Sequence, residues 1–188
     1  MKTSATFRLF FVLFLPTILI SQPRPKILVV YYSQGGHTKA MAEAVSRGAS
    51  SAVVTVKTVI EATTADVLSA DAVIVGSPVY NANTAPQVQE FINRWPFEGS
   101  PLKDKIGAAF VTGGGISAGE ELVQLNILHS MLIFGMIVVG GPEWTGAFGA
   151  SAVTGETPFD SKTVDEKFIR KAEALGQRVA EVVSKIKR

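Results

Sequence analysis

The alternation of two kinds of segment after residue 25 is the feature that most constrains the fold of this chain. Continuous runs of β-branched and other apolar residues, such as "KILVVYY", alternate with segments whose apolar residues recur at helical spacing. A continuous apolar run is typical of a strand that a parallel sheet buries on both faces. Because right-handed crossovers join parallel strands, the alternation predicts an α/β fold, a doubly wound five-stranded parallel sheet with helices on both faces.

The expected elements follow from these runs. The strands are expected at 26–32, 51–59, 71–80, 105–113 and 136–141. The helices are expected at 37–50, 85–95, 119–134 and 164–186. Two further stretches are expected to lack regular structure, a short polar connection at 64–70 and an irregular segment at 142–160.

The first 25 residues have a different composition from the rest of the chain. Two cations and no acid precede an apolar stretch from Leu9 to Ile20. At about 12 residues this stretch is short for a membrane span but suits the apolar part of a secretory signal. A cut after Ser21 would place Leu19 where a small residue is preferred. We therefore expect a signal peptide or N-terminal anchor at 1–25 and one folded domain at 26–188.

The charge and the cysteine content exclude several kinds of function. The formal net charge is +2, and the N-terminal segment contributes this surplus through Lys2 and Arg8, so the remaining domain is neutral. No basic surplus indicates a nucleic-acid partner. The chain has no cysteine, which excludes disulfides, thiolate metal sites and thiol catalysis. No metal site is expected.

The loop "SQGGHT", from Ser33 to Thr38, joins the first expected strand directly to a helix. Ligands of open parallel sheets bind beyond the carboxyl ends of the strands. A helix N-terminus presents unpaired N–H groups and partial positive charge, so it can bind a phosphate without cationic side chains. Neither a Walker A motif nor G-x-G-x-x-G is present. The alternative is a plain turn in which Thr38 or Ser33 caps the helix.

Two further loops lie at the same expected end of the sheet. "GSPVYNANTAPQ" places Tyr80 among the amides of Asn81 and Asn83, which suits a flat heteroaromatic ligand. A capped turn with an exposed tyrosine is the alternative. "VTGGGISAGEE" has three consecutive glycines after a buried strand, and their entropic cost indicates a close approach. Glu120 and Glu121 follow in the first turn of a helix, where the dipole favours acids without any functional role.

These three loops, in this order, resemble those of the flavodoxin-like superfamily, and within it the WrbA-type NAD(P)H:quinone oxidoreductases and their FMN-reductase relatives. The stretches that carry the resemblance are "YYSQGGHTKAMAEAVSRGA", "DAVIVGSPVYNANTAPQVQEFINR", "KIGAAFVTGGGISAGEE" and "TGETPFD". The resemblance extends over residues 26–185. It implies a flavodoxin-like sheet with strand order 2-1-3-4-5, and an FMN-binding domain at 26–188.

The resemblance also assigns residues to FMN, position by position. The residues implied for the phosphate are Ser33, Gln34, Gly35, Gly36, His37 and Thr38. Those implied to flank the isoalloxazine ring are Ser77, Pro78, Val79 and Tyr80. Those implied for its opposite edge and the ribityl chain are Thr112, Gly113, Gly114, Gly115 and Ile116. His37 is the one candidate catalytic side chain, with an exposed loop histidine as the alternative.

The sequence departs from the WrbA pattern near the end of the helix at 119–134. That group carries a histidine immediately before a Gly-Met pair, where this chain has Phe134. His129 lies further back and is expected to be a partly buried helix residue. Trp95 ends an apolar helical stripe and is expected in the core. The departure bears on the quinone-reductase assignment and leaves FMN binding unaffected.

The function that the resemblance implies is transfer of two electrons from NAD(P)H through FMN to a quinone-type acceptor, in a homodimer or homotetramer. Two alternatives stay open, a flavodoxin-type electron carrier and a non-redox binding module. The neutral domain argues against the carrier, since such carriers tend to be acidic. We expect export to the periplasm or a membrane anchor through 9–20. A cytoplasmic domain stays open because nicotinamide cofactors belong to the cytosol.

Overall fold

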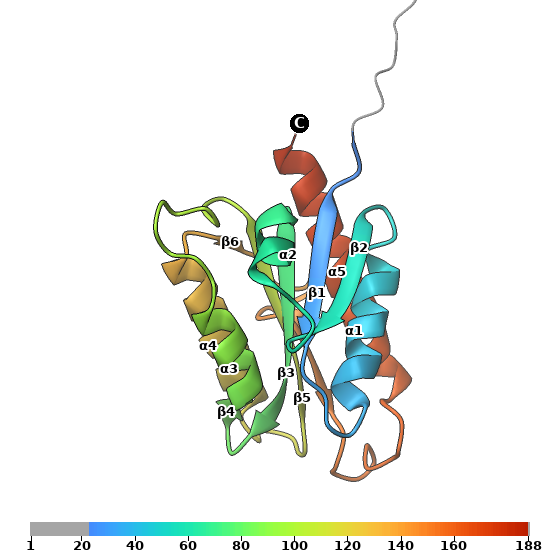
Figure 1. The fold of residues 1–188 in the computed structure, drawn as a ribbon. Helices are drawn as coiled ribbons and strands as arrows, with labels where there is room; N and C mark the ends of the chain where they lie inside the picture. Colours follow the sequence, from blue (N-terminus) through green and yellow to red (C-terminus); the bar gives the residue numbers. More distant parts are fainter. Residues whose placement is uncertain (1–22, 188) are drawn as a thin grey trace, which may run out of the picture.

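The computed structural model describes residues 23–187, in which one parallel sheet lies between two layers of helices (Figure 1). The expected leader at 1–25 falls almost wholly outside the described residues. The strands are β1 (Lys26–Tyr31), β2 (Val53–Thr58), β3 (Ala72–Tyr80), β4 (Asn83–Thr84), β5 (Ile106–Gly113), β6 (Ile137–Val138) and β7 (Ala150–Val153). The helices are α1 (His37–Gly48), α2 (Thr64–Ser69), α3 (Pro86–Asn93), α4 (Glu120–Ile133) and α5 (Glu166–Ile186), with a 3-10 turn η1 (Trp144–Gly146).

The main sheet has the order β2-β1-β3-β5-β6, and all of these neighbours are parallel. With β5 and β6 as the fourth and fifth expected strands, this is the order 2-1-3-4-5. The predicted α/β fold is confirmed. Because the strands are parallel, the carboxyl ends of β1, β3 and β5 lie at one edge of the sheet, at the bottom of Figure 1.

Each face of the sheet has its own apolar core. On one face α1 and α5 pack over the sheet, with Met41 and Leu175 fully buried. On the other face α2, α3 and α4 cover the sheet, with Phe91 and Ile127 buried there. Burial of apolar side chains on both faces explains why the central strands read as continuous apolar runs.

Trp95 belongs to the second core, as expected, and is only 4% exposed. Its ring packs against Phe91 on one side and Phe134 on the other. The expectation that His129 is partly buried is wrong, since it is exposed. The buried stripe of α4 includes Leu128 and Met131, and His129 falls outside it.

The prediction of a fifth strand at 136–141 is correct in place but too long. Only Ile137 and Val138 pair with β5, and the chain then leaves the sheet at Gly140 and Gly141. A side chain at Gly140 would collide with the backbone of Ala147, so the chain folds back on itself between these two residues. The prediction that the segment 142–160 is irregular is wrong in part. It returns as β7, which pairs with β5 from Phe110 to Gly113.

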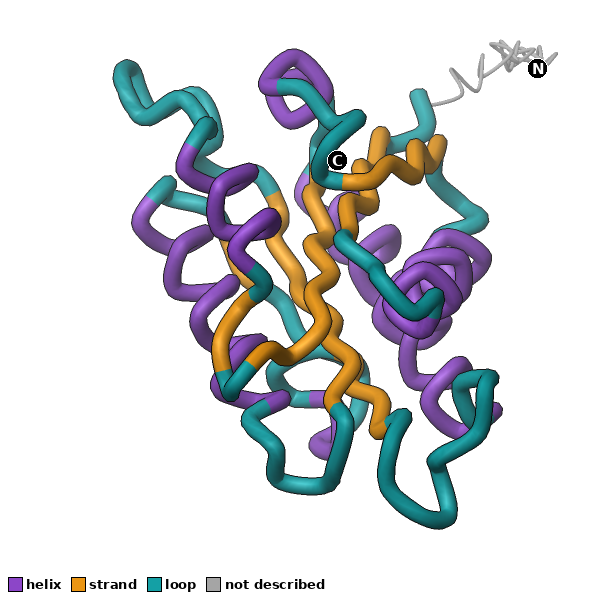
Figure 2. Tube along the Cα trace, turned by 60° about the horizontal axis from the view of Figure 1, so that its bottom comes forward, coloured by secondary structure: helices purple, strands orange, loops and turns teal. Residues whose placement is uncertain are grey.

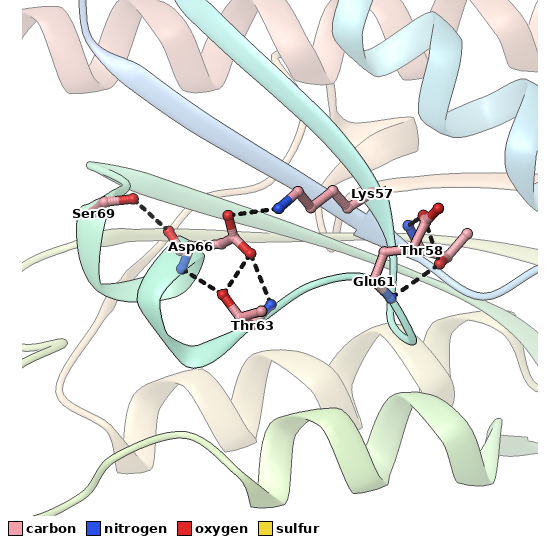
Figure 3. A network of polar contacts seen from close by, with 6 residues as sticks. All are labelled: Lys57, Thr58, Glu61, Thr63, Asp66 and Ser69. Atoms are coloured by element: carbon pink, nitrogen blue, oxygen red, sulfur yellow. Dashed lines mark hydrogen bonds and ion pairs between the residues drawn. The ribbon is translucent and has the colours of Figure 1, made fainter.

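The stretch expected as a polar connection at 64–70 forms α2 instead. Thr63 and Asp66 make a reciprocal capping box, in which each side chain accepts the backbone N–H of the other residue. Lys57 of β2 also donates to Asp66, at 2.8 Å (Figure 3). The capping pattern was present in the sequence. The short helix lacks the apolar periodicity that identified the longer ones.

Removal of the Asp66 charge tests this network. The hydrogen bond from Lys57, and then those from the Thr63 backbone and hydroxyl, lower the pKa of Asp66 to about 2. This folded-state pKa lies below the unfolded value of about 3.9, so ionised Asp66 stabilises the fold fully above that pH. The contribution is lost as the pH falls towards 2. Asp66→Asn should reduce the free energy of unfolding by about 1 kcal/mol at pH 7.

The measurement is urea unfolding of wild type and variant at pH 7, 5 and 3, and the difference should shrink at the lowest pH. Glu43→Gln is the control, since it removes an exposed carboxylate from α1. A difference that stays constant down to pH 3 would contradict the role of the Asp66 charge.

Candidate functional site

Three loops meet at the carboxyl edge of the sheet, and a fourth segment joins them. They follow β1, β3 and β5, and the fourth runs from the end of β7 to the start of α5. Figure 2, in which this end of the molecule comes forward, shows them as loops that extend past the strands. The residues that the sequence assigned to a ligand lie in these loops, at the ends of the strands before them or, for His37 and Thr38, in the first turn of α1.

The first loop leaves the start of α1 open. Gly36 is the N-cap, with φ of 91°, and no side chain caps the helix. The hydroxyl of Ser33 accepts the N–H of Gly36 at 3.1 Å and so shapes the turn. A Cβ atom at Gly35 or Gly36 would meet nothing within 4 Å. The alternative that Ser33 or Thr38 caps the helix is therefore not what the structure has. No side chain therefore accepts a hydrogen bond from the N–H groups in the first turn of α1.

The second loop is a tight hairpin that continues β3. Tyr80 pairs with Asn83 of β4, and the turn passes through Asn81 and Ala82 with φ of 50° and 60°. Such values are costly for residues other than glycine, and they are typical of a two-residue hairpin turn. The hydroxyl of Ser77, fully buried, accepts the N–H of Ala85 at 3.0 Å. Ser77 thus fixes the path of the loop and does not face outward.

The Tyr80 side chain crosses from the second loop to the first. Its hydroxyl donates to the side-chain carbonyl of Gln34 at 2.8 Å, and its ring meets Tyr32 edge to face. Burial raises the pKa of Tyr80, and Tyr32 raises it further. The phenol therefore stays neutral at physiological pH and can donate its hydrogen bond to Gln34.

The third loop begins buried and ends exposed. Thr112 and Gly113 are buried at the end of β5, whereas Gly114 is exposed and Ile116 is 59% exposed. The Ser117 N–H donates to one oxygen of Glu120 at 3.1 Å, and the other oxygen, Oε2, is buried without a hydrogen-bond partner. Glu120 therefore shapes this loop, a role that its place in a first helical turn did not indicate.

Hydrogen bonds tie the loops to one another. The hydroxyls of Thr38 and Thr112 lie 2.8 Å apart and are buried, which joins the first loop to the third. The Ile116 N–H donates to Glu156 at 2.6 Å, which joins the third loop to the segment before α5. His37 contacts the backbone carbonyl of Lys162 in that same segment, through Nε2 at 3.2 Å. In this geometry His37 holds two segments together, and any catalytic role for it stays a prediction.

The sequence missed the segment between β7 and α5 as part of the site. Glu156 reaches the third loop, and Thr154 donates its N–H and its hydroxyl to the Gly113 carbonyl at 2.9 and 3.2 Å. "TGETPFD" was part of the family resemblance, but nothing in its composition marks a ligand contact. Only the pairing of β7 with β5 brings these residues to the loops.

The donors gathered here are backbone N–H groups and hydroxyls. Within residues 23–187 no group of three or more His, Asp or Glu side chains could hold a metal ion. A Cβ atom at Gly114 would meet nothing within 4 Å, as at Gly35 and Gly36, so backbone at both loops is open to a ligand. An uncapped helix start suits a phosphate, and a hairpin with a tyrosine beside a glycine-rich loop suits a planar ring. These residues fit FMN.

The buried hydroxyl pair gives a direct test of how the loops are joined. Thr38→Val should destabilise the fold by about 1–3 kcal/mol, because it leaves the Thr112 hydroxyl buried without a partner. The double variant with Thr112→Val should cost less than the sum of the two single variants. Urea unfolding measures all three, with Thr55→Val on the exposed edge strand as control. Additive losses would show that the two hydroxyls do not interact.

Comparisons with known proteins agree with this geometry. The family described as NADPH-dependent FMN reductase matches residues 48–151. An NAD(P)H dehydrogenase (quinone) of Azorhizobium caulinodans is 34% identical over 166 residues, which cover 74% of this chain and 82% of that protein. A flavodoxin of Aquifex aeolicus is 35% identical over 172 residues, covering 85% of this chain and 87% of that protein.

Solved structures show the same fold. A flavodoxin, WrbA-like protein from Agrobacterium tumefaciens has a TM-score of 0.69 at 24% identity, over 86% of this chain and 98% of that one. A flavodoxin from the domain Archaea has a TM-score of 0.67 at 26% identity, over 85% of this chain and 99% of that one. The resemblance seen in the sequence is confirmed, and the chain belongs to the NADPH-dependent FMN reductase family, on a flavodoxin-like fold.

Proposed function

We propose that this protein is an FMN-dependent oxidoreductase that transfers two electrons from NAD(P)H to a quinone-type acceptor. Membership of the FMN reductase family supports the flavin and the oxidoreductase class. The relative from Azorhizobium caulinodans, an NAD(P)H dehydrogenase (quinone), supports the donor and the acceptor. The observation that carries the proposal is the start of α1, which no side chain caps and which the Thr38–Thr112 contact joins to the third loop.

In this proposal the first loop binds the FMN phosphate. The N–H groups of the first turn of α1 and the partial positive charge of the helix favour an anion there. Gly35 lets the backbone approach the phosphate, and Gly36 adopts the left-handed conformation that begins the helix. Thr38 acts indirectly, because its hydroxyl is held by Thr112. Binding of a phosphate in this way requires no cationic side chain, which is consistent with the neutral net charge of the domain.

The second and third loops would hold the flavin ring between them. Tyr80, fixed by Gln34 and Tyr32, offers an aromatic face and edge beside the hairpin. Exposed backbone at Gly114 offers N–H and carbonyl groups to the polar edge of the ring. Bound FMN would supply the redox chemistry, namely uptake of a hydride from the nicotinamide and delivery of two electrons to the acceptor. The chain binds and orients the flavin.

The Phe134 departure leaves this part of the proposal intact. Phe134 follows the end of α4, which has 14 residues and therefore places it about 20 Å along the helix axis from the third loop. Its ring packs between Trp95 and Phe97. Neither a phenylalanine nor a histidine at that place reaches the loops of its own chain.

A flavodoxin-type electron carrier is the second candidate. The Aquifex aeolicus flavodoxin and the archaeal flavodoxin favour it, since both match more than four-fifths of this chain. A carrier needs the same flavin site but no site for a nicotinamide or a quinone. The homodimer or homotetramer stays a prediction in either case.

The decisive measurement is anaerobic visible spectroscopy of the purified protein loaded with FMN. NADH or NADPH should bleach the bound flavin within the mixing time or in seconds, and benzoquinone should restore its colour. Steady-state rates should follow ping-pong kinetics. Bound flavin that ignores both nucleotides would assign the electron carrier, and failure to bind FMN would overturn both candidates.

A charge placed in the first loop tests the phosphate site separately. Gly35 has open space around it and no left-handed φ, so Gly35→Asp should fold. An acid near a helix start stabilises the helix but repels a phosphate. We expect the Kd for FMN to rise at least about tenfold, equivalent to about 1.4 kcal/mol.

Gly35→Ala is the matched control, because it fills the same space without charge and should bind within a few-fold of wild type. Flavin fluorescence quenching gives both constants. Equal affinity of Gly35→Asp and wild type would place the phosphate away from this loop.

A further inference from the structure

The end of the domain opposite the four loops has features that the proposed function does not use. Strands β1, β3 and β5 begin there, and α3, α4 and α5 end there, at the top of Figure 1. The described chain also enters at this end, through Arg24, whose guanidinium binds backbone carbonyls of Ser50 and Ser51. We call this surface the entrance face and define it by Phe97, Lys103, Ile133, Ile186 and Lys187.

Large apolar side chains are exposed on the entrance face. Ile133 is 71% exposed, Phe97 is 64% exposed and Ile186 is 52% exposed. Phe97 is fixed in that position, because its ring packs edge to face against Phe134, which rests on Trp95. Phe97 and Ile133 border one hollow of about 160 Å³. Exposed apolar side chains that gather around one hollow are typical of an interaction site.

Cations outnumber acids on and around this face. Among the residues that line its two hollows, the cations are Lys103, Lys105 and Lys187 and the acids are Asp71 and Asp104. Lys103 lines both the hollow beside Phe97 and the neighbouring one beside Ile186. Asp71 is engaged within the protein, since it pairs with Lys187 at 2.7 Å and accepts the Lys26 N–H. The face therefore combines apolar side chains with surplus positive charge.

The apolar stretch Leu9–Ile20 joins the domain at this same face. It lies outside the described residues, and only residues 21–25 separate it from β1. Five residues span at most about 18 Å, even fully extended. Wherever that stretch enters a bilayer, the entrance face is held close to the lipid surface. In the described part of the chain, no helix has the length and apolar character needed to cross a membrane.

We propose that the entrance face rests on the surface of a bilayer that contains anionic lipid. Phe97, Ile133 and Ile186 would enter the headgroup region, and Lys103 with its neighbours would meet the lipid phosphates. The four loops at the other end of the sheet then face away from the membrane and stay open to water. This inference does not depend on the proposed chemistry, because no residue of the face belongs to the loops.

Single-cysteine labelling tests the orientation on the full chain, which has no cysteine of its own. An environment-sensitive fluorophore is attached at Phe97→Cys and, as the matched control at the loop end, at Ser161→Cys. Vesicles of phosphatidylcholine mixed with phosphatidylglycerol should shift the emission of the label at position 97 to the blue, and spin-labelled lipid should quench it several-fold. The label at 161 should not respond. Equal responses at both positions, or none at 97, would overturn the proposal.

Charge variants test the lipid chemistry of the face. In a chain labelled at Ile133→Cys, Lys103→Glu should weaken the response to mixed vesicles at least several-fold. Lys39→Glu, on the exposed surface of α1, should not. Pure phosphatidylcholine should give the smaller response. Equal responses to both lipids would overturn the role of anionic lipid. A response without vesicles that grows with protein concentration would assign the face to contact between copies and overturn the membrane proposal.

Discussion

The parallel pairing of β1, β3 and β5 is the constraint on which the rest of the structure depends. The connections between these strands cross a face of the sheet, so β1, β3 and β5 all end at the same end of the sheet and helices return the chain to the other end. Loops that are far apart in the sequence therefore become neighbours. The same pairing separates the molecule into two ends, one with the loops and one where the strands begin.

The proposed flavin site relies on backbone groups of the loops, so its precision depends on how the loops are held. Here the loops are fixed by hydrogen bonds within them, such as Ser117 to Glu120, and also by hydrogen bonds between them. The Thr38–Thr112 pair is buried, and a buried hydroxyl without a partner is costly, so the two loops cannot separate freely. Glu156 adds a fourth segment through the Ile116 N–H. Residues with positive φ, such as Asn81 and Ser117, complete these turns.

The two ends of the sheet carry different surfaces. The loop end is rich in glycine and hydroxyl groups, which suits a phosphate and a ring. The entrance face is apolar and cationic, which suits a lipid surface. In the proposed orientation, lipid contact and flavin binding are kept apart by the length of the sheet. A domain with no net charge can still have a cationic surface at one end, because the net charge does not describe how the charges are distributed over the surface.

The sequence by itself determined the fold class, the strand order through its family resemblance, and the loops that meet at the site. Its apolar runs, such as "KILVVYY", are long enough to be identified as buried strands without knowledge of the tertiary structure. Only the tertiary structure decided the rest. The two-residue β6 and the return of β7 depend on pairing with β5, and the outward position of His129 depends on which side of α4 meets the sheet. Glu156 became part of the site for the same reason, since long-range contacts leave no periodic pattern in the residues that make them.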